Sequence, residues 1–186
     1  MASVLVPLAQ GCEELEAVTI IDLLRRGNIQ VTTAALKSGP VLASRGTVLM
    51  ADMTLDDALR GREYDMVALP GGLPGADHLQ NDPRIVSLVR KMSAQNKYVA
   101  AICAAPRVLL KANIVNGKRI TCFPGSLKPV DLQGVTLSED AVVQDGNIIT
   151  SRGPGTAMDF ALLLVELLSD KANRDYVESS LQRARS

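Results

Sequence analysis

Short apolar runs rich in Val, Ile and Ala alternate along the chain with segments whose apolar residues recur at helical spacing. This alternation is typical of a parallel sheet that is covered by helices on both faces. We therefore predict an α/β fold. Residues 1–186 contain no linker, repeat or low-complexity stretch, so we expect a single domain. With 186 residues, 47% of them apolar, the chain can bury a full core without a metal or a disulfide.

The pattern places each element on a definite stretch of sequence. Strands are expected at residues 3–8, 30–36, 66–69, 98–102, 119–122 and 148–151. Helices are expected at residues 14–26, 84–95, 107–111, 157–169 and 171–183. Asp145-Gly146 stands between two β-branched runs, which is a strong hairpin signal. We predict that this hairpin forms a small antiparallel appendage to the main sheet.

Charge and composition limit the classes of partner. The formal net charge is zero and aromatic residues make up 3% of the chain, so the basic patch and stacking platform of a nucleic-acid binder are missing. No apolar segment approaches the roughly 20 residues needed to span a bilayer, and no secretion signal is recognisable. Cys12, Cys103 and Cys122 match neither a CxxC motif nor a zinc pattern. We expect free thiols, no membrane association and a cytoplasmic location.

Cys103 falls between a buried strand that stops at Ile102 and a helix whose first turn contains Pro106. Small neighbours such as Ala104 allow the tight turn that exposes a nucleophile in hydrolase-type elbows. A thiol so placed faces the amides of a helix N-terminus, which favour the reactive thiolate. The alternative is that Cys103 is a small core residue, since free cysteine is often buried.

Glu16 is the second candidate. On a helical wheel of residues 14–26, this carboxylate lies inside the apolar arc that faces the core. A buried carboxyl must be hydrogen-bonded or protonated, and its pKa tends to rise. A protonated Glu16 could donate a hydrogen bond to a thiolate; the alternative is a charge that complements the helix dipole or a frayed, exposed side chain. Glu14 lies on the polar face, where a solvated structural role is expected.

The glycine turn after residue 69 supplies backbone donors. Gly71-Gly72 permits close backbone approach and unusual dihedral angles, although such a turn by itself is more often only a tight connection. If this turn lies beside the cysteine turn at the carboxyl edge of the sheet, the N–H groups of Gly72 and Ala104 would form an oxyanion hole.

The chain has one histidine, His78, and no late His–x–Glu that would complete a triad with Cys103. Peptidase and amidotransferase chemistry therefore lack a general base. No cluster of His, Asp or Glu has metal-ligand spacing, so we expect neither a metal nor another cofactor.

Five motifs together resemble the ThiJ/PfpI superfamily, in the branch that contains the parkinsonism-associated protein deglycase and bacterial YajL. They are GCEELEAVTIIDLLRRG at 11–27, SRG at 44–46, LPGG at 69–72, AAICAAP at 100–106 and TSRGPGTAMDFAL at 150–162. The resemblance covers nearly the whole chain.

The resemblance implies a flavodoxin-like three-layer sandwich, a homodimer, a nucleophilic and oxidisable Cys103, and a hydrogen-bonding Glu16. It also implies pocket arginines at Arg45 and Arg152. Members of this family act without a cofactor on glyoxal, methylglyoxal or their glycated adducts and take part in protection against oxidative stress. Phe123 stands where the deglycase has a pocket histidine, so this chain departs from that pattern and is similar to the YajL-like members.

Three hypotheses follow. The first is a glyoxalase or deglycase in which Cys103 adds to a dicarbonyl and Glu16 moves the proton. The second is a redox sensor or redox-controlled chaperone in which oxidation of Cys103 is the signal. The third is a dimeric scaffold whose cysteine is incidental.

Overall fold

The computed structural model describes residues 1–183, except for the side chains of residues 129 and 131. Its main sheet has the order β10-β11-β7-β6-β1-β2-β5, and all neighbours are parallel except β10 and β11. The strands are β1 Ser3–Leu8, β2 Gln30–Ala35, β5 Met53–Thr54, β6 Met66–Leu69, β7 Tyr98–Ile102, β10 Val142–Asp145 and β11 Ile148–Ser151. The helices are α1 Glu14–Arg26, α2 Leu55–Leu59, α3 Gly75–Asn81, α4 Pro83–Ala94, α5 Pro106–Lys111, α6 Ala157–Leu168 and α7 Lys171–Ser180. The predicted α/β class is confirmed.

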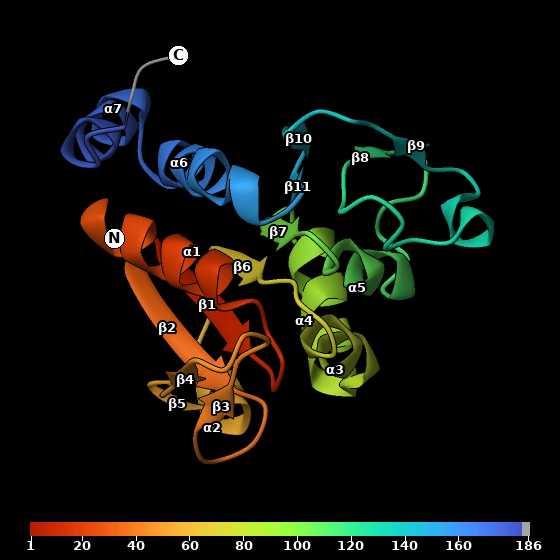
Figure 1. Cartoon of the computed structure of the whole chain (residues 1–186), viewed down its shortest axis with the longest axis horizontal. Helices are drawn as coiled ribbons and strands as arrows, with labels where there is room; N and C mark the ends of the chain where they lie inside the picture. The colour runs from red at the N-terminus through yellow and green to blue at the C-terminus, as the bar shows by residue number, and fades with distance from the viewer. Residues whose placement is uncertain (184–186) are drawn as a thin grey trace.

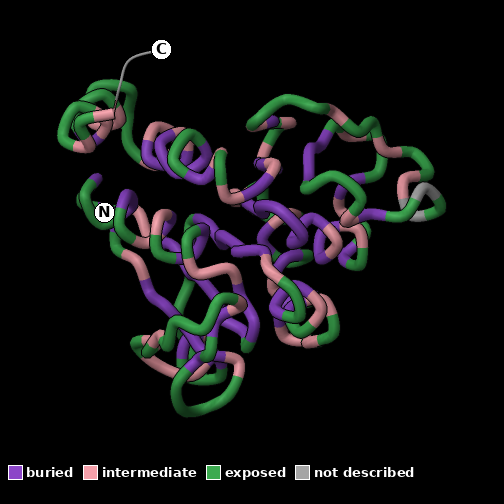
Figure 2. Tube along the Cα trace, viewed as in Figure 1, coloured by how far each residue is buried: buried purple, intermediate pink, exposed green. Residues whose placement is uncertain are grey.

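Helices cover both faces of the sheet (Figure 1). Successive side chains of a strand point to opposite faces, so Val4 and Val6 of β1 pack with α1 and α6, whereas Leu5 packs with α4 and α5. Two apolar cores result, and the buried stretches of Figure 2 follow the central strands and α6. None of the described helices is long and apolar enough to cross a membrane.

The sequence predicts the central strands and the long helices to within about three residues of their observed ends. The short elements were not predicted, because stretches of two to seven residues carry too little periodicity. These are α2, β5, the hairpin of β3 (Val41–Leu42) and β4 (Val48–Leu49), β9 (Thr136–Leu137) and the 3₁₀ turns η1 (Pro129–Leu132) and η2 (Pro154–Thr156). A short helix is expected from the sequence around His78, where α3 lies.

Two predictions about the second half of the chain need refinement. The hairpin at Asp145-Gly146 is present, but β11 is itself a member of the main sheet beside β7, so only β10 is an antiparallel addition. The strand expected at 119–122 is shorter, β8 (Arg119–Ile120), and pairs with β9 in a separate sheet. Just beyond its end, the N–H of Thr121 donates to the hydroxyl of Thr150 in β11.

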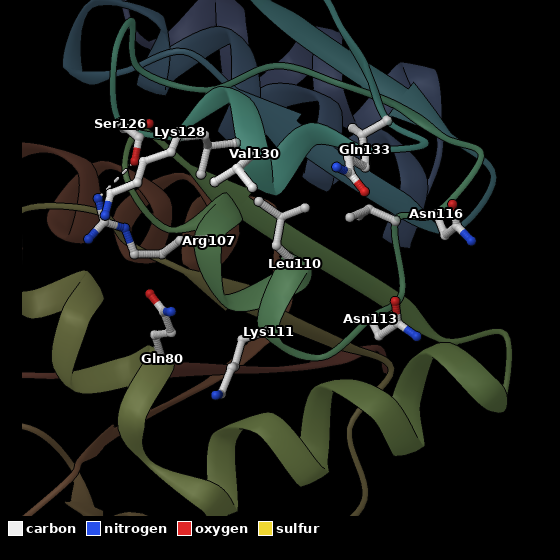
Figure 3. Close-up of a pocket in the computed structure, with 13 residues that line it drawn as sticks. Gln80, Arg107, Leu110, Lys111, Asn113, Asn116, Ser126, Lys128, Val130 and Gln133 are labelled. Atoms are coloured by element: carbon white, nitrogen blue, oxygen red, sulfur yellow. Dashed lines mark hydrogen bonds between the residues drawn. The ribbon is translucent and has the colours of Figure 1, made fainter.

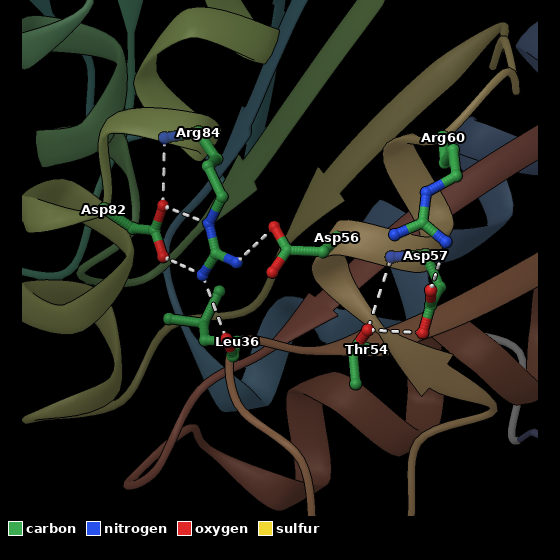
Figure 4. Close-up of polar contacts among 7 residues, drawn as sticks. All are labelled: Leu36, Thr54, Asp56, Asp57, Arg60, Asp82 and Arg84. Carbon is green, nitrogen blue, oxygen red and sulfur yellow. Dashed lines mark hydrogen bonds and ion pairs between the residues drawn. The ribbon is translucent and has the colours of Figure 1, made fainter.

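Arg84, at the start of α4, ties three elements together at the carboxyl edge of the sheet (Figure 4). Its guanidinium donates to Asp82 at 2.6 Å, to Asp56 of α2 at 2.8 Å and to the carbonyl of Leu36, just after β2, at 2.9 Å. The hydrogen bonds that Arg84 donates to Asp82 lower the pKa of that carboxyl group. Arg60 in the same figure makes one ion pair with Asp57 and is far more exposed.

We expect Arg84→Ala to lower the free energy of unfolding by roughly 1–3 kcal/mol, because it removes charged hydrogen bonds that are partly shielded from water. The matched control, Arg60→Ala, should cost about 0–1 kcal/mol, because exposed ion pairs contribute little. Urea denaturation of both variants at neutral pH measures the difference. Equal losses for the two variants would show that Arg84 is no stronger a tie than a surface ion pair.

Candidate active site

Cys103 lies where β7 stops, and its backbone is unusual. Its φ angle is +62°, a left-handed conformation that few residues other than glycine adopt. The turn is held from both sides: the N–H of Cys103 donates to the carbonyl of Ser151 at 2.9 Å, and its carbonyl accepts from the N–H of Phe123 at 2.9 Å. The residue is 8% exposed. The sharp strand-to-helix turn expected from the sequence is therefore present, and Cys103 keeps a small solvent-exposed fraction in it.

Glu16 is fully buried on the inward face of α1. Its Oε2 accepts a hydrogen bond from the N–H of Gly71 at 2.8 Å, while Oε1 has no hydrogen-bond partner among the described residues. Burial raises the pKa of Glu16 to about 7, against the opposing hydrogen bonds from Gly71 and the Cys103 thiol. Oε1 is thus the oxygen that is free to hold a proton near neutral pH.

The glycine turn brings Glu16 and Cys103 together. A Cβ at Gly71 would lie 2.6 Å from Cβ of Cys103 and 2.8 Å from Oε2 of Glu16, so no larger residue fits between them. Gly72 follows with a φ angle of +86°. The backbone N–H groups of Gly72 and Ala104 lie near the Cys103 thiol and act to lower its pKa. The two amides that the sequence suggested for an oxyanion hole therefore both lie beside the cysteine turn.

The expected direction of the Cys103 pKa was wrong. The sequence argument predicted a lowered value, because amides at a helix start favour a thiolate. In the structure burial, and then the neighbouring Glu16 carboxylate, raise the pKa of Cys103 to about 12 and outweigh the amides of Gly72 and Ala104. The free thiol is consequently neutral when Glu16 is ionised, and the carboxylate is positioned to remove its proton.

Arg45 lies in the exposed loop between β3 and β4, beside the start of α1. Its backbone N–H donates to both oxygens of Glu14 at 3.0 Å, and Ser44 and Thr47 donate to the same carboxylate. Partial desolvation acts the other way, but these hydrogen bonds, with that from the N–H of Glu14 itself, lower its pKa to about 2. Sequence analysis gave Glu14 only a solvated role; the motif 44–46 was the available signal for this contact.

Arg152 and Phe123 border the cysteine turn without reaching its acid–base pair. The guanidinium of Arg152 donates to the carbonyl of Glu139 at 2.7 Å. The ring of Phe123 is 48% exposed and lies against Gly153, where a Cβ would be 3.1 Å from Cδ2. Among the described residues, neither Arg45 nor Arg152 makes a side-chain hydrogen bond to Cys103 or Glu16. The structure thus gathers Cys103, Glu16, Gly72 and Ala104 closely and leaves Arg45, Arg152 and Phe123 around them.

Sequence reasoning missed Arg107, which braces the turn from behind. Its Nε donates to the carbonyl of Ala104 at 3.1 Å, one terminal nitrogen pairs with Asp77 of α3, and the other donates to the carbonyl of Ser126 at 3.0 Å. Nothing in the local pattern signals this role, because two of the three partners, Asp77 and Ser126, are distant in sequence. His78 lies elsewhere, in the wall of a separate cavity of about 440 Å³.

All three thiols are buried, and Cys12, Cys103 and Cys122 form no disulfide. Burial, together with the nearby Glu14, raises the pKa of Cys12 to about 11. Within residues 1–183, no group of three His, Cys, Asp or Glu side chains is arranged to hold a metal ion.

A parallel sheet with a strained cysteine turn, a buried glutamate and two converging amides defines an α/β protein of the flavodoxin-like class with a potential nucleophile at the sheet's carboxyl edge. The chain matches the family model described as "DJ-1/PfpI family" over residues 2–167. It belongs to the DJ-1/PfpI family.

Curated relatives and solved structures agree with this assignment. The chain is 43% identical to the Parkinson disease protein 7 homolog of Danio rerio over 166 residues, 88% of each protein. It is 36% identical to the glutathione-independent glyoxalase DJR-1.2 of Caenorhabditis elegans, over 90% of this chain and 88% of that protein. It is 44% identical to the DJ-1 homolog B of Arabidopsis thaliana over 88% of this chain, which spans only 37% of that longer relative.

Two solved structures superpose over nearly the full length. Drosophila melanogaster DJ-1beta has a TM-score of 0.93 at 40% identity and 99% coverage of both chains. Toxoplasma gondii DJ-1, solved in an oxidised form, has a TM-score of 0.91 at 35% identity and complete coverage of both chains.

The raised pKa of Glu16 makes stability depend on pH. The folded state holds this proton more tightly than the unfolded state, so the stability contributed by neutral Glu16 is complete below pH 4.5 and is lost as the pH rises through about 7. We expect the free energy of unfolding to fall over this window, relative to Glu16→Gln, by on the order of 3 kcal/mol.

Chemical denaturation of the parent and Glu16→Gln at several pH values measures this change. All other titrating groups are common to both proteins and cancel in the comparison. A difference in stability that stays constant across the window would contradict the raised pKa.

Proposed function

We propose that this protein is a cofactor-independent glyoxalase or deglycase that acts on glyoxal, methylglyoxal or their adducts through Cys103. The observation that carries the proposal is the pairing of a buried Glu16 carboxyl, with one oxygen unpartnered, and a thiol whose pKa the nearby N–H groups of Gly72 and Ala104 act to lower. A base, a nucleophile and an oxyanion site then lie together without a histidine or a metal.

The first step adds the thiol to the aldehyde carbon of the dicarbonyl. Glu16 takes the Cys103 proton as the carbon–sulfur bond forms, which offsets the high pKa of the buried thiol. The developing alkoxide lies where the N–H groups of Gly72 and Ala104 can donate to it. Return of the proton from Glu16 to this oxygen gives a neutral hemithioacetal.

The second step moves a proton within the adduct. Glu16 removes the hydrogen from the carbon bonded to sulfur and returns it to the adjacent carbon, while the hydroxyl proton passes to the neighbouring carbonyl oxygen, giving a 2-hydroxyacyl thioester. Water then cleaves the thioester, releasing glycolate from glyoxal or lactate from methylglyoxal and restoring the thiol. One carbon is oxidised and its neighbour is reduced, so the sequence needs water but no external oxidant or reductant.

The glyoxalase among the relatives supports this assignment, since it is named as glutathione-independent and aligns with 90% of this chain. Deglycase activity on glycated substrates would use the same first adduct, reached from an aminocarbinol. We extend the proposal to protection against carbonyl and oxidative stress in the cytoplasm, which stays a prediction.

Cys103→Ser should reduce methylglyoxal turnover to background, because a hydroxyl is a far weaker nucleophile than a thiol. Glu16→Gln should also lower kcat strongly, by roughly 10²–10⁴-fold, because the amide cannot carry the proton. Lactate formation, followed by enantioselective chromatography, measures both. Cys122→Ser, which removes a buried thiol outside the reacting pair, is the matched control and should keep parental turnover. Methylglyoxal turnover retained in Cys103→Ser would contradict the proposed mechanism.

A second candidate function is redox sensing, with or without chaperone activity. The unpartnered Oε1 of Glu16 and the amides of Gly72 and Ala104 could hydrogen-bond the oxygens of a sulfinate at Cys103. The oxidised form in which the Toxoplasma relative was solved favours this alternative. Intact-mass analysis after dilute peroxide distinguishes redox sensing from turnover alone, because a sensor gains oxygen at Cys103 before Cys12 or Cys122.

We also propose that the protein is a homodimer. Five apolar side chains that are at least 47% exposed lie on α1 and near the β3–β4 hairpin: Leu15, Val18, Leu42, Val48 and Met50. Glu14 joins these two elements through its hydrogen bonds to the loop at 44–47. An apolar surface of this kind is typical of an interface between subunits.

Val18→Glu should convert a dimer into a monomer, because it places a charge within the buried apolar surface. Tyr176→Glu introduces the same charge at an exposed apolar position on α7 and should leave the dimer intact. Sedimentation velocity at micromolar concentration gives the mass of each species. A monomeric parent, or a Val18→Glu variant that stays dimeric, would contradict the proposed interface.

A further inference from the structure

A cavity of about 730 Å³ lies on the outer side of α5, and Cys103 is not among the residues that line it. Figure 3 shows its walls: Arg107, Leu110 and Lys111 come from α5, Gln80 from α3, and Lys128, Val130 and Gln133 from the segment that includes η1. Its volume is that of a pocket for a small organic molecule.

The charge of this cavity is one-sided. Three cations, Arg107, Lys111 and Lys128, line it, and no described lining residue is an aspartate or glutamate. Arg107 and Lys111 share one face of α5 because they are four residues apart. Lys111 and Lys128 are exposed and form no ion pair with a described carboxylate, so their charge is available to a ligand.

The remaining lining sets the shape of the ligand. Leu110 and Val130 lie between the cationic end and an end lined by the amides of Asn113 and Gln133 (Figure 3). An anionic group would contact the cations, an apolar body would cover the leucine and valine, and a polar group would reach the amides. No aromatic side chain lines the cavity, so recognition by stacking is not favoured.

Arg107 connects this cavity to the cysteine turn. Its hydrogen bonds to Ala104, Asp77 and Ser126 use three of the five guanidinium N–H groups, which leaves two for a ligand. The hydroxyl of Ser126 lies 3.5 Å from the carbonyl of Cys103. A ligand that binds Arg107 therefore affects the hydrogen bonds that this side chain donates to the carbonyls of Ala104 and Ser126, beside the cysteine turn.

We propose that this cavity binds an organic phosphate and that its occupancy changes the reactivity of Cys103. A phosphate dianion suits a cavity lined by three cations better than a carboxylate monoanion does, and arginine binds phosphate through paired N–H donors. The site is separate from the proposed carbonyl chemistry, since its ligand would not enter the reacting pair of Glu16 and Cys103.

Binding of phenyl phosphate, measured by isothermal titration calorimetry at fixed ionic strength, tests the site. Lys111→Ala/Lys128→Ala should weaken binding about tenfold, because two cations are lost. Lys91→Ala/Lys171→Ala removes two exposed charges elsewhere and is the matched control, for which affinity should not change. Absence of binding to the parent, or equal affinity in both double variants, would overturn the site.

The rate of Cys103 alkylation by iodoacetamide tests the connection. Saturating phenyl phosphate should change this rate at least about twofold in the parent but not in Lys111→Ala/Lys128→Ala, as linkage between two sites requires. Benzyl alcohol, which has the ring without the charge, should leave the rate unchanged. Phosphate binding with no change in alkylation would overturn the connection, and neither readout depends on glyoxalase turnover.

Discussion

A fully buried carboxyl group joins the first helix to the turn that carries Cys103. Glu16 leaves α1 among apolar neighbours and accepts its one clear hydrogen bond from the backbone of Gly71. An ionised carboxylate in such surroundings is costly, so the site favours a proton near neutral pH. The glycine turn, the close approach of Cys103 and the position of α1 all follow from fitting this group between a strand end and a helix start.

The same burial raises the pKa of the Cys103 thiol. The expectation of a thiolate at rest depended on the amides alone, whereas the structure adds desolvation and a neighbouring negative charge. One proton is therefore shared by two groups, and reactivity depends on its transfer between them rather than on a permanently low thiol pKa. The single histidine, His78, lines a cavity elsewhere, so Glu16 is the titratable group that lies beside the Cys103 thiol.

Most of the sheet and the acid–base pair could be predicted from the sequence for local reasons. Buried strands such as Met66–Leu69 read as apolar runs, and the helical wheel of α1 already turned Glu16 inward. The long-range contacts of Arg107 and Glu14 could not be predicted in this way, because these partners lie 19 to 33 residues away and are brought together only by the fold. The pKa of Cys103 was missed because sequence gives neighbours in the chain but not the degree of burial.

The first turn of helix α1 carries two carboxylates, Glu14 and Glu16, whose titration ranges do not overlap. Glu14 has a pKa of about 2 and keeps its charge, and with it the loop of Arg45, throughout the pH range in which Glu16 gains or loses its proton near 7. In the first turn of the helix, Glu14 thus anchors the neighbouring loop, whereas Glu16 is the carboxyl group that titrates near neutral pH. A fall in cellular pH would alter the protonation of the site while the loop beside it keeps its anchor.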